Sequence, residues 1–304
     1  MSAHQKPLYI IAAHGGAGYH PPSSDSSLKR SLRAAISSAL PAFSGATISH
    51  SSNSSESSLL ALDATTAVIV TLEDHPDFNA GYGSNLTFDG QVECDASLMV
   101  SMDEMQEEGK GNGSPSLPSS QSFPSEFGSV GAVCGVRNPV LLARRILEGR
   151  RQRERTGMGI GRVPPLTLVG EGAVKFAREQ GVRVVDVPEE MVAPRARQEW
   201  RVWRERCRRD RGDGDEKFES RDLPPREEDG ADSEALRVRL DTVGAVVLVG
   251  EAHDIGQRPE VAAGVSRCVV PFDLLFPEFV NKVAPMRLIF FHLAGAYCSS
   301  TLDA

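Results

Sequence analysis

Short apolar runs that end in glycine or proline alternate with longer stretches of helical periodicity over much of the chain. Strands are predicted for such runs at residues 8–13, 91–100, 129–136, 166–169 and 242–249, with 261–265 as the partner of the last. Segments that are largely apolar, or apolar at every third or fourth position, predict helices at 27–43, 59–72, 139–148 and 172–180. The elements do not alternate strictly, which favours sheets packed between helical layers over a doubly wound sheet.

Three polar stretches interrupt this pattern. Residues 44–58 are rich in serine, residues 105–125 combine glycine, serine and proline, and residues 189–235 are strongly charged. Segments of such composition bury too little apolar surface to offset the entropy that ordering costs. They are therefore predicted to be disordered insertions, the last of them a flexible linker.

The overall composition excludes several classes of protein. A net charge of -8 over 304 residues argues against nucleic-acid binding, which requires a basic surface. The first apolar run is too short for a signal peptide, and without about 18 consecutive apolar residues no membrane span is predicted. Five cysteines without zinc-ligand spacing predict free thiols in a reducing compartment, hence a cytoplasmic or nuclear protein.

Several short blocks contain the candidate chemistry. They are HGGAG (14–18), LEDHPDFNAGYGS (72–84) with ECDASLM (93–99), GSVGAV (128–133) with Asn138-Pro139, RVPP (162–165) with LVGEGA (168–173), and LDTVGAVV (240–247). Each alone is weak evidence, since GGAG matches neither the dinucleotide-binding nor the P-loop spacing and threonine is common in strands. The histidine and carboxylates of the second block lack metal-ligand spacing, so no metal and no cofactor are predicted.

Taken together and in this order, the blocks resemble the type 2 asparaginase family of N-terminal-nucleophile hydrolases over residues 8–266. Two details are similar to the threonine aspartase (taspase) branch. Asp241 stands where ordinary asparaginases have glycine, and GRVPP occupies residues 161–165.

The resemblance implies an α/β (α+β) domain over residues 1–266, built as a four-layer αββα sandwich. It also implies that the precursor is cut between Asp241 and Thr242, which makes Thr242 the nucleophile. A free α-amine at Thr242 can then act as base toward its own hydroxyl. Carried over by position, Asn79 and the pair Gly15–Gly16 line the site near Thr242, and Ser266 is a further candidate to line it.

Three functions follow as expectations. The first is a threonine-type endopeptidase that cuts after aspartate in a peptide or protein substrate. The second is an asparaginase or isoaspartyl dipeptidase on the same fold, and the third is a catalytically inactive, truncated homologue. In the family the αβ units form a homodimer. Its asparaginases hold sodium with backbone carbonyls, here those of Leu72, Glu73, His75, Phe78, Ala80 and Tyr82.

The resemblance stops after Ser266. Arg267 stands where the family has a second serine or threonine, and the substrate-binding arginine and the Thr-Gly oxyanion pair have no counterpart in 267–304. This tail is predicted to be unrelated to the family, either a truncation or a mis-spliced C-terminus with a retained intron. The chain is then expected to show no turnover, and apolar side chains of the nucleophile strand are expected to lack partners: Val243, Ala245, Val247 and Val249.

An arginine-rich segment, PRARQEWRVWRERCRRDR, covers residues 194–211. Two interpretations stay open. In the first it is a nuclear-import signal, as in the long loop of the taspases. In the second it is a solvated charged helix whose sparse apolar stripe consists of Trp200, Trp203 and Cys207. Acidic residues between 210 and 232 disfavour nucleic-acid binding.

Overall fold

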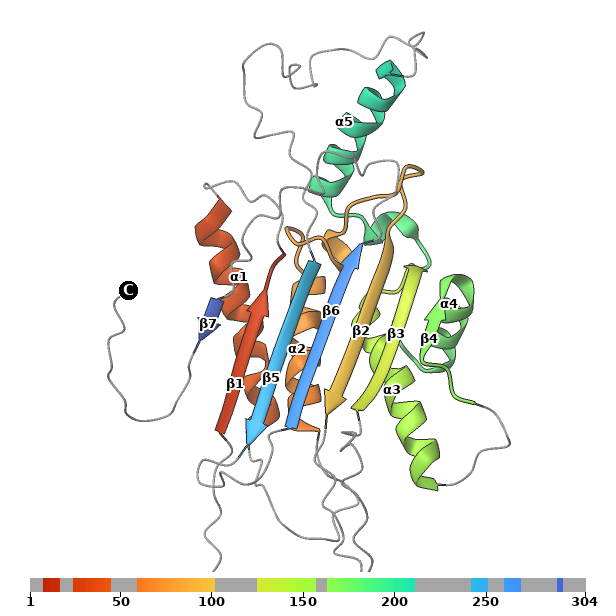
Figure 1. The fold of residues 1–304 in the computed structure, drawn as a ribbon. Helices are drawn as coiled ribbons and strands as arrows, with labels where there is room; N and C mark the ends of the chain where they lie inside the picture. The colour runs from red at the N-terminus through yellow and green to blue at the C-terminus, as the bar shows by residue number, and fades with distance from the viewer. Residues whose placement is uncertain are drawn as a thin grey trace, which may run out of the picture.

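The computed structural model describes residues 8–16, 24–44, 59–101, 125–156, 163–210, 242–250, 260–268 and 289–291. Within them a seven-stranded sheet has the order β4-β3-β2-β6-β5-β1-β7 (Figure 1). Neighbouring strands are antiparallel except β3 and β4, so the sheet is mixed. The strands are β1 (Leu8–His14), β2 (Glu93–Ser101), β3 (Ser125–Cys134), β4 (Thr167–Val169), β5 (Thr242–Gly250), β6 (Glu260–Cys268) and β7 (Ile289–Phe291).

The helices lie close to the predicted ranges. They are α1 (Asp25–Ser38), α2 (Leu60–Glu73), α3 (Pro139–Thr156), α4 (Gly170–Glu179) and α5 (Pro194–Asp210), with short 3-10 turns η2 (Leu40–Phe43), η3 (Gly81–Gly83) and η4 (Pro188–Met191). None of the described helices is both long enough and apolar enough to cross a membrane. The predicted pairing of the last two long strands is confirmed, since Ala245 of β5 lies opposite Gly264 of β6.

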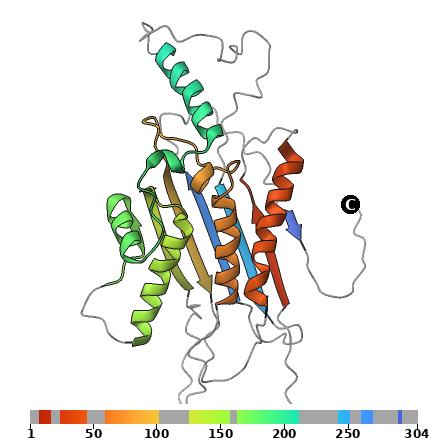
Figure 2. The ribbon, with the colours of Figure 1, turned by 180° about the vertical axis from the view of Figure 1, so that it is seen from behind.

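Helices α1, α2 and α3 cover one face of the sheet (Figure 2). Because side chains of a strand alternate between faces, every second residue of β5 points toward these helices. The core between the two layers includes fully buried side chains from α2, α3 and β2: Leu62, Ile69, Leu72, Leu98, Leu142 and Leu147. Packing in this core determines where each strand lies along its own axis and thereby positions the strand ends.

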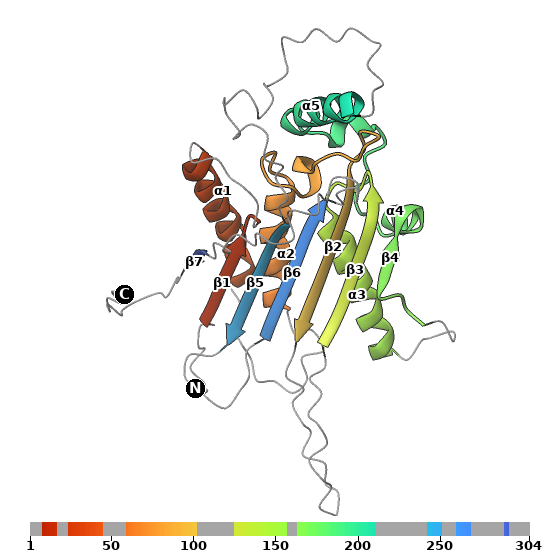
Figure 3. The same cartoon turned by 45° about the horizontal axis from the view of Figure 1, so that its top comes forward.

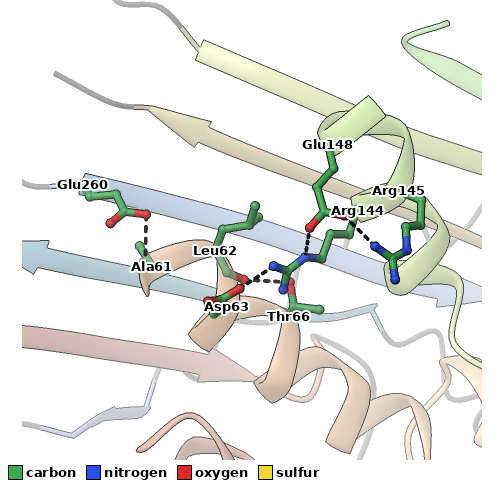
Figure 4. Close-up of polar contacts among 8 residues, drawn as sticks. All are labelled: Ala61, Leu62, Asp63, Thr66, Arg144, Arg145, Glu148 and Glu260. Atoms are coloured by element: carbon green, nitrogen blue, oxygen red, sulfur yellow. Dashed lines mark hydrogen bonds and ion pairs between the residues drawn. The ribbon is translucent and has the colours of Figure 1, made fainter. Parts of the chain in front are cut away.

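Polar contacts at the edge of this core fasten α2 to its neighbours (Figure 4). Arg144 of α3 donates to Asp63 of α2 and, over 2.6 Å, to Glu148 on its own helix. Glu260, at the start of β6, accepts from the backbone N–H of Ala61 at 3.2 Å. Burial raises the pKa of Glu260 to about 7, although the amides of Ala61 and Leu62 oppose that shift. These contacts join the first turn of α2 to both α3 and β6.

The other face, which we call the open face, carries no helix among the described residues (Figure 1). The strand register arranges its residues in rows across β1, β5, β6 and β2. One row is polar and consists of Thr242, Arg267 and Asp95. The next row along the strands is mixed and consists of His14, Gly244, Val265 and Ser97. The row after it is apolar and consists of Ala12, Val246, Ala263 and Met99. Val246, Val265 and Met99 are 39%, 41% and 47% exposed.

This arrangement corrects two expectations. The prediction of a four-layer sandwich is confirmed only in part, since the described residues form one helical layer and one sheet. The residues expected to lack partners, Val243, Ala245, Val247 and Val249, are buried under the helices. A continuous apolar strand does not reveal which of its two faces is covered. Here the alternate residues of β5 point to the face that no described helix covers.

The prediction of a linker over 189–235 is wrong for its first part. Residues 188–191 form η4 and residues 194–210 form α5, and Met191, Ala193 and Ala196 are buried. Residues 211–235, like most of the predicted insertions at 44–58 and 105–125, lie outside the described residues. The helix supports the charged-helix interpretation of 194–211, and nuclear import stays a prediction.

Candidate active site

Thr242 is the first residue of β5 and lies at the polar end of the open face, half-buried. Its cross-strand partner is Arg267 of β6, whose Nε donates to Asp95 Oδ2 on β2 at 3.1 Å. Residues directly opposite on one face of a sheet have Cβ atoms about 5 Å apart. An ion pair therefore lies beside the predicted nucleophile. Asp241, the other half of the predicted cleavage bond, lies outside the described residues.

His14, the last residue of β1, lies on the other side of Thr242. Its ring packs directly on Gly244 and forms a hydrogen bond with the backbone of Thr242. Burial lowers the pKa of His14, and the bond to Thr242 raises it by less. The ring is therefore neutral at neutral pH, and its Nδ1 atom is buried without a hydrogen-bond partner among the described residues.

Gly15 brings the end of β1 against the loop that carries Asn79. A Cβ atom at Gly15 would lie 2.5 Å from the ring of Phe78, so no other residue fits without displacing that ring. Gly16 follows with φ 105°, a conformation that glycine adopts most readily. The predicted Gly15–Gly16 pair therefore acts as a close-packed turn next to the site.

Asn79 is buried, at 1% exposure, and it holds its loop at both its side chain and its backbone. Its Oδ1 accepts from the backbone N–H of Asn85 at 2.8 Å. Its carbonyl accepts from the N–H of Cys268 at 3.2 Å, one residue beyond Arg267. The structure thus brings Asn79, Gly15 and Thr242 to the same end of the sheet.

Ser266 does not lie beside Thr242, which corrects the prediction that it lines the site. It is opposite Val243 on the helix-covered face, because neighbouring residues of a strand point to opposite faces. Its buried Oγ atom and Oε2 of Glu73 both lack a hydrogen-bond partner among the described residues. Glu73 Oε1 accepts from the N–H of Val140 at 3.0 Å.

Glu73 is the most strongly shifted carboxyl near the site. Burial raises the pKa of Glu73 to about 8, and the nearby polar groups of Ser266, Val140 and Asn138 oppose that shift. A proton on Oε2 would allow the acid to donate to the Ser266 hydroxyl, which would satisfy both atoms at once. This pair supports the site from behind the sheet rather than from the side of Thr242.

Sequence reasoning missed His14, the Arg267–Asp95 pair and Glu73 as contributors to the site. His14 was visible as a histidine that ends a strand just before two glycines. The position of Arg267 opposite Thr242 depends on strand register, which the sequence does not specify.

Cysteines and several acidic side chains lie among the described residues. No group of three or more histidine, cysteine or acidic residues is arranged to hold a metal ion in the described part of the chain. Cys94, Cys134 and Cys268 are free thiols. Burial raises the pKa of Cys94 to about 12, and a thiol that stays protonated is a poor nucleophile.

Comparison with known proteins identifies the family of the chain. A protein-family model described as Asparaginase matches residues 7–106 and 123–266. A plant-type L-asparaginase of Pyrococcus abyssi is 35% identical over 146 residues, which cover 48% of this chain and 35% of the relative. An isoaspartyl peptidase/L-asparaginase of Mus musculus is 33% identical over 137 residues, 45% of this chain and 31% of the relative. The corresponding protein of Danio rerio is 31% identical over 195 residues, which cover 64% of this chain and 47% of the relative.

The chain therefore belongs to the asparaginase family, in its type 2 branch with an N-terminal nucleophile. It spans less than half the length of these curated relatives. Their names are those of asparaginases and isoaspartyl peptidases, so the family assignment holds without the narrower assignment to the threonine aspartases.

Proposed function

We propose that Thr242 becomes an N-terminal nucleophile through cleavage of the Asp241–Thr242 bond and then hydrolyses the side-chain amide of asparagine or an isoaspartyl peptide bond. The observation that carries the proposal is the position of Thr242. It begins a strand at the polar end of the open face. His14 forms a hydrogen bond with its backbone, and Arg267 lies opposite it on the neighbouring strand.

The cleavage step requires only groups of the chain and water. The Oγ atom of Thr242 attacks the carbonyl carbon of Asp241, the C–N bond breaks, and the acyl group moves to oxygen as an ester. Water then hydrolyses the ester, which leaves a carboxylate on Asp241 and a free amine on Thr242. That amine has a reference pKa of about 7.7, so it can take the proton of its own hydroxyl in later turnovers.

The substrate class rests on the relatives. The names of the matched proteins refer to asparaginase and isoaspartyl peptidase activity. Both reactions hydrolyse an amide bond formed by the side-chain carboxyl group of aspartate. A second candidate is an endopeptidase that cuts after aspartate. Asp241 supports this candidate, since the proposed self-cleavage is itself hydrolysis of an Asp–Thr peptide bond.

The decisive experiment is N-terminal sequencing of the purified chain after incubation. A fragment that begins at Thr242 is expected from the wild type and from Thr242→Ser, while Thr242→Ala should stay intact. Wild type that never yields this fragment, or a Thr242→Ala variant that is processed normally, would remove Thr242 as the nucleophile and leave the inactive homologue as the better description.

The two substrate classes are separated by assaying processed protein in parallel. Ammonia release from asparagine and aspartate release from isoaspartyl dipeptides are expected under the first proposal. Processed protein without any turnover would instead match the inactive, truncated homologue implied by the missing arginine and oxyanion pair. Cleavage of ordinary Asp-containing peptides, without either of those products, would favour the endopeptidase instead.

A further inference from the structure

Helix α5 is docked by its N-terminal half onto the loop that carries Asn79 (Figure 3). Ala193 and Ala196 are buried. Further along, the Nε1 atom of Trp200 donates to the carbonyl of Phe88 at 3.2 Å, and its ring packs on Gly90. The contacts join a highly charged segment to the top of the sheet, where Thr242 lies.

Arg195 is the polar centre of this contact. Its Nη2 donates to the carbonyl of Gly83 at 2.6 Å and its Nε to the carbonyl of Pro76 at 3.2 Å. Its Nη1 donates to Glu199 at 2.6 Å, which fixes the guanidinium on the helix. The side chain is 17% exposed, so these bonds are partly shielded from water. One rigid, planar group thus bridges the two ends of the loop.

The loop brings several carbonyl groups close together. A Cβ atom at Gly83 would lie 2.4 Å from the carbonyl oxygen of His75 and 2.2 Å from that of Phe78. Backbone oxygens that lie this close concentrate partial negative charge, and Arg195 donates charge-assisted hydrogen bonds to two other carbonyls of the same loop, those of Pro76 and Gly83.

We propose that Arg195 is a positioning residue that holds the loop closed from residue 76 to residue 83 and so fixes Asn79 at the Thr242 end of the sheet. The chain of contacts is continuous. Arg195 holds Pro76 and Gly83, Asn79 lies between them, and the carbonyl of Asn79 binds Cys268 beside Arg267. The effect on Thr242 chemistry rests on the proposed function, whereas the effect on the loop does not.

The test compares Arg195→Ala and Arg195→Lys with Arg201→Ala, a matched control at an exposed position of the same helix. Hydrogen exchange of residues 76–86 is measured in the full chain, together with the thermal midpoint. Arg195→Ala should raise exchange in this loop roughly tenfold, since it removes charge-assisted hydrogen bonds. Arg195→Lys should restore little, because an ammonium does not reproduce the planar two-carbonyl contact, and Arg201→Ala should resemble wild type.

Chemical rescue separates positioning from general stability. Guanidinium ions at millimolar concentration should return loop exchange in Arg195→Ala toward the wild-type value, while the same concentration of tetramethylammonium chloride should not, with the sodium concentration held constant throughout. Exchange that is unchanged in Arg195→Ala, or raised equally in Arg201→Ala, would overturn the proposal.

Self-cleavage provides the second readout. If wild type cleaves, Arg195→Ala should cleave several-fold more slowly and guanidinium should accelerate it. A looser loop with an unchanged cleavage rate would overturn the positioning role while the proposed function stands. If wild type does not cleave at all, the proposed function fails, and loop exchange with its rescue still decides whether Arg195 holds the loop.

Discussion

Thr242 and Arg267 lie directly opposite each other on β5 and β6, with both residues on the open face of the sheet. The guanidinium of Arg267 is held by Asp95 on the next strand. The residue opposite the predicted nucleophile is therefore a cation whose Nε is engaged by a neighbour, where the family resemblance implies a hydroxyl.

Replacing Arg267 by threonine is expected to accelerate self-cleavage. A hydroxyl directly opposite Thr242 can donate to the peptide group under attack, and one additional hydrogen bond in the transition state corresponds to roughly a tenfold gain in rate. The measurement is the fraction of cleaved chain against time on a denaturing gel. Val265→Thr, on the same face but opposite Gly244, is the control, and equal acceleration by both variants would contradict the role of position 267.

Glu73 should make the stability of the chain depend on pH. The pKa of Glu73 is about 8 when folded, against an ordinary value of 4.5, so the folded state binds this proton more tightly than the unfolded state does. Its contribution is complete below about pH 4.5 and is lost as pH rises toward about 8, with a total on the order of 5 kcal/mol.

Glu73→Gln should flatten this dependence. The amide keeps an acceptor for Val140 and supplies a donor for Ser266, but it does not titrate. Urea unfolding of both proteins at several pH values between about 4.5 and 8 measures the difference in slope. Glu171→Gln, at an exposed position of α4, should retain the wild-type slope. A variant at position 73 with the same slope as wild type would show that another group is responsible.

The sequence predicted most elements because their signals are local. Short apolar runs closed by glycine mark β1 and β5, and these need no knowledge of the partner strands. The face that each strand buries is a different matter. The run from Val243 to Val249 is apolar at almost every position, so only packing against α2 determines which alternate residues are covered.

The site was predictable to the same extent. The order of the motifs predicted Thr242, Gly15 and Asn79 as site residues, and the structure gathers them at one end of the sheet, while their roles stay predictions. Arg195 was hidden inside a segment whose composition indicated a linker. The spacing of Ala193, Ala196 and Trp200 is that of a narrow helical stripe. The charged-helix interpretation included Trp200 in its apolar stripe but not the two alanines.

The two faces of β5 should respond differently to truncation. Val247 is fully buried and Val246 is 39% exposed, although they are neighbours with identical side chains. Val247→Ala is expected to cost about 2 kcal/mol of unfolding free energy because it leaves a cavity under α2. Val246→Ala should cost less than about 0.5 kcal/mol. Denaturant unfolding of the two variants measures this contrast, and equal losses would mean that the open face is covered in solution.

Deletions within the charged segment should separate α5 from the residues that follow it. Removal of residues 189–210 takes away the buried Met191, Ala193 and Ala196 and the Arg195 contacts, so soluble yield and thermal midpoint should fall sharply. Removal of residues 211–235 should be tolerated, since their composition provides little apolar area to bury. The two deletions are compared by yield and by melting temperature, and similar losses for both would refute this division of the segment.

Asn79→Ala should lower both stability and self-cleavage. The side-chain oxygen of Asn79 is buried and accepts from the N–H of Asn85 at 2.8 Å, so the variant leaves that amide without its acceptor, at a cost of about 2 kcal/mol.

Asn79→Asp is the informative partner because a carboxylate retains the acceptor oxygen, whereas the Nδ2 donor is lost. If Asn79 serves only to hold the loop, Asn79→Asp should cleave at close to the wild-type rate per folded molecule. If its amide also acts on the Thr242 chemistry, Asn79→Asp should fold and fail to cleave. The measurement is cleavage rate and unfolding free energy for both variants, made on the same preparations so that loss of fold and loss of chemistry are counted separately.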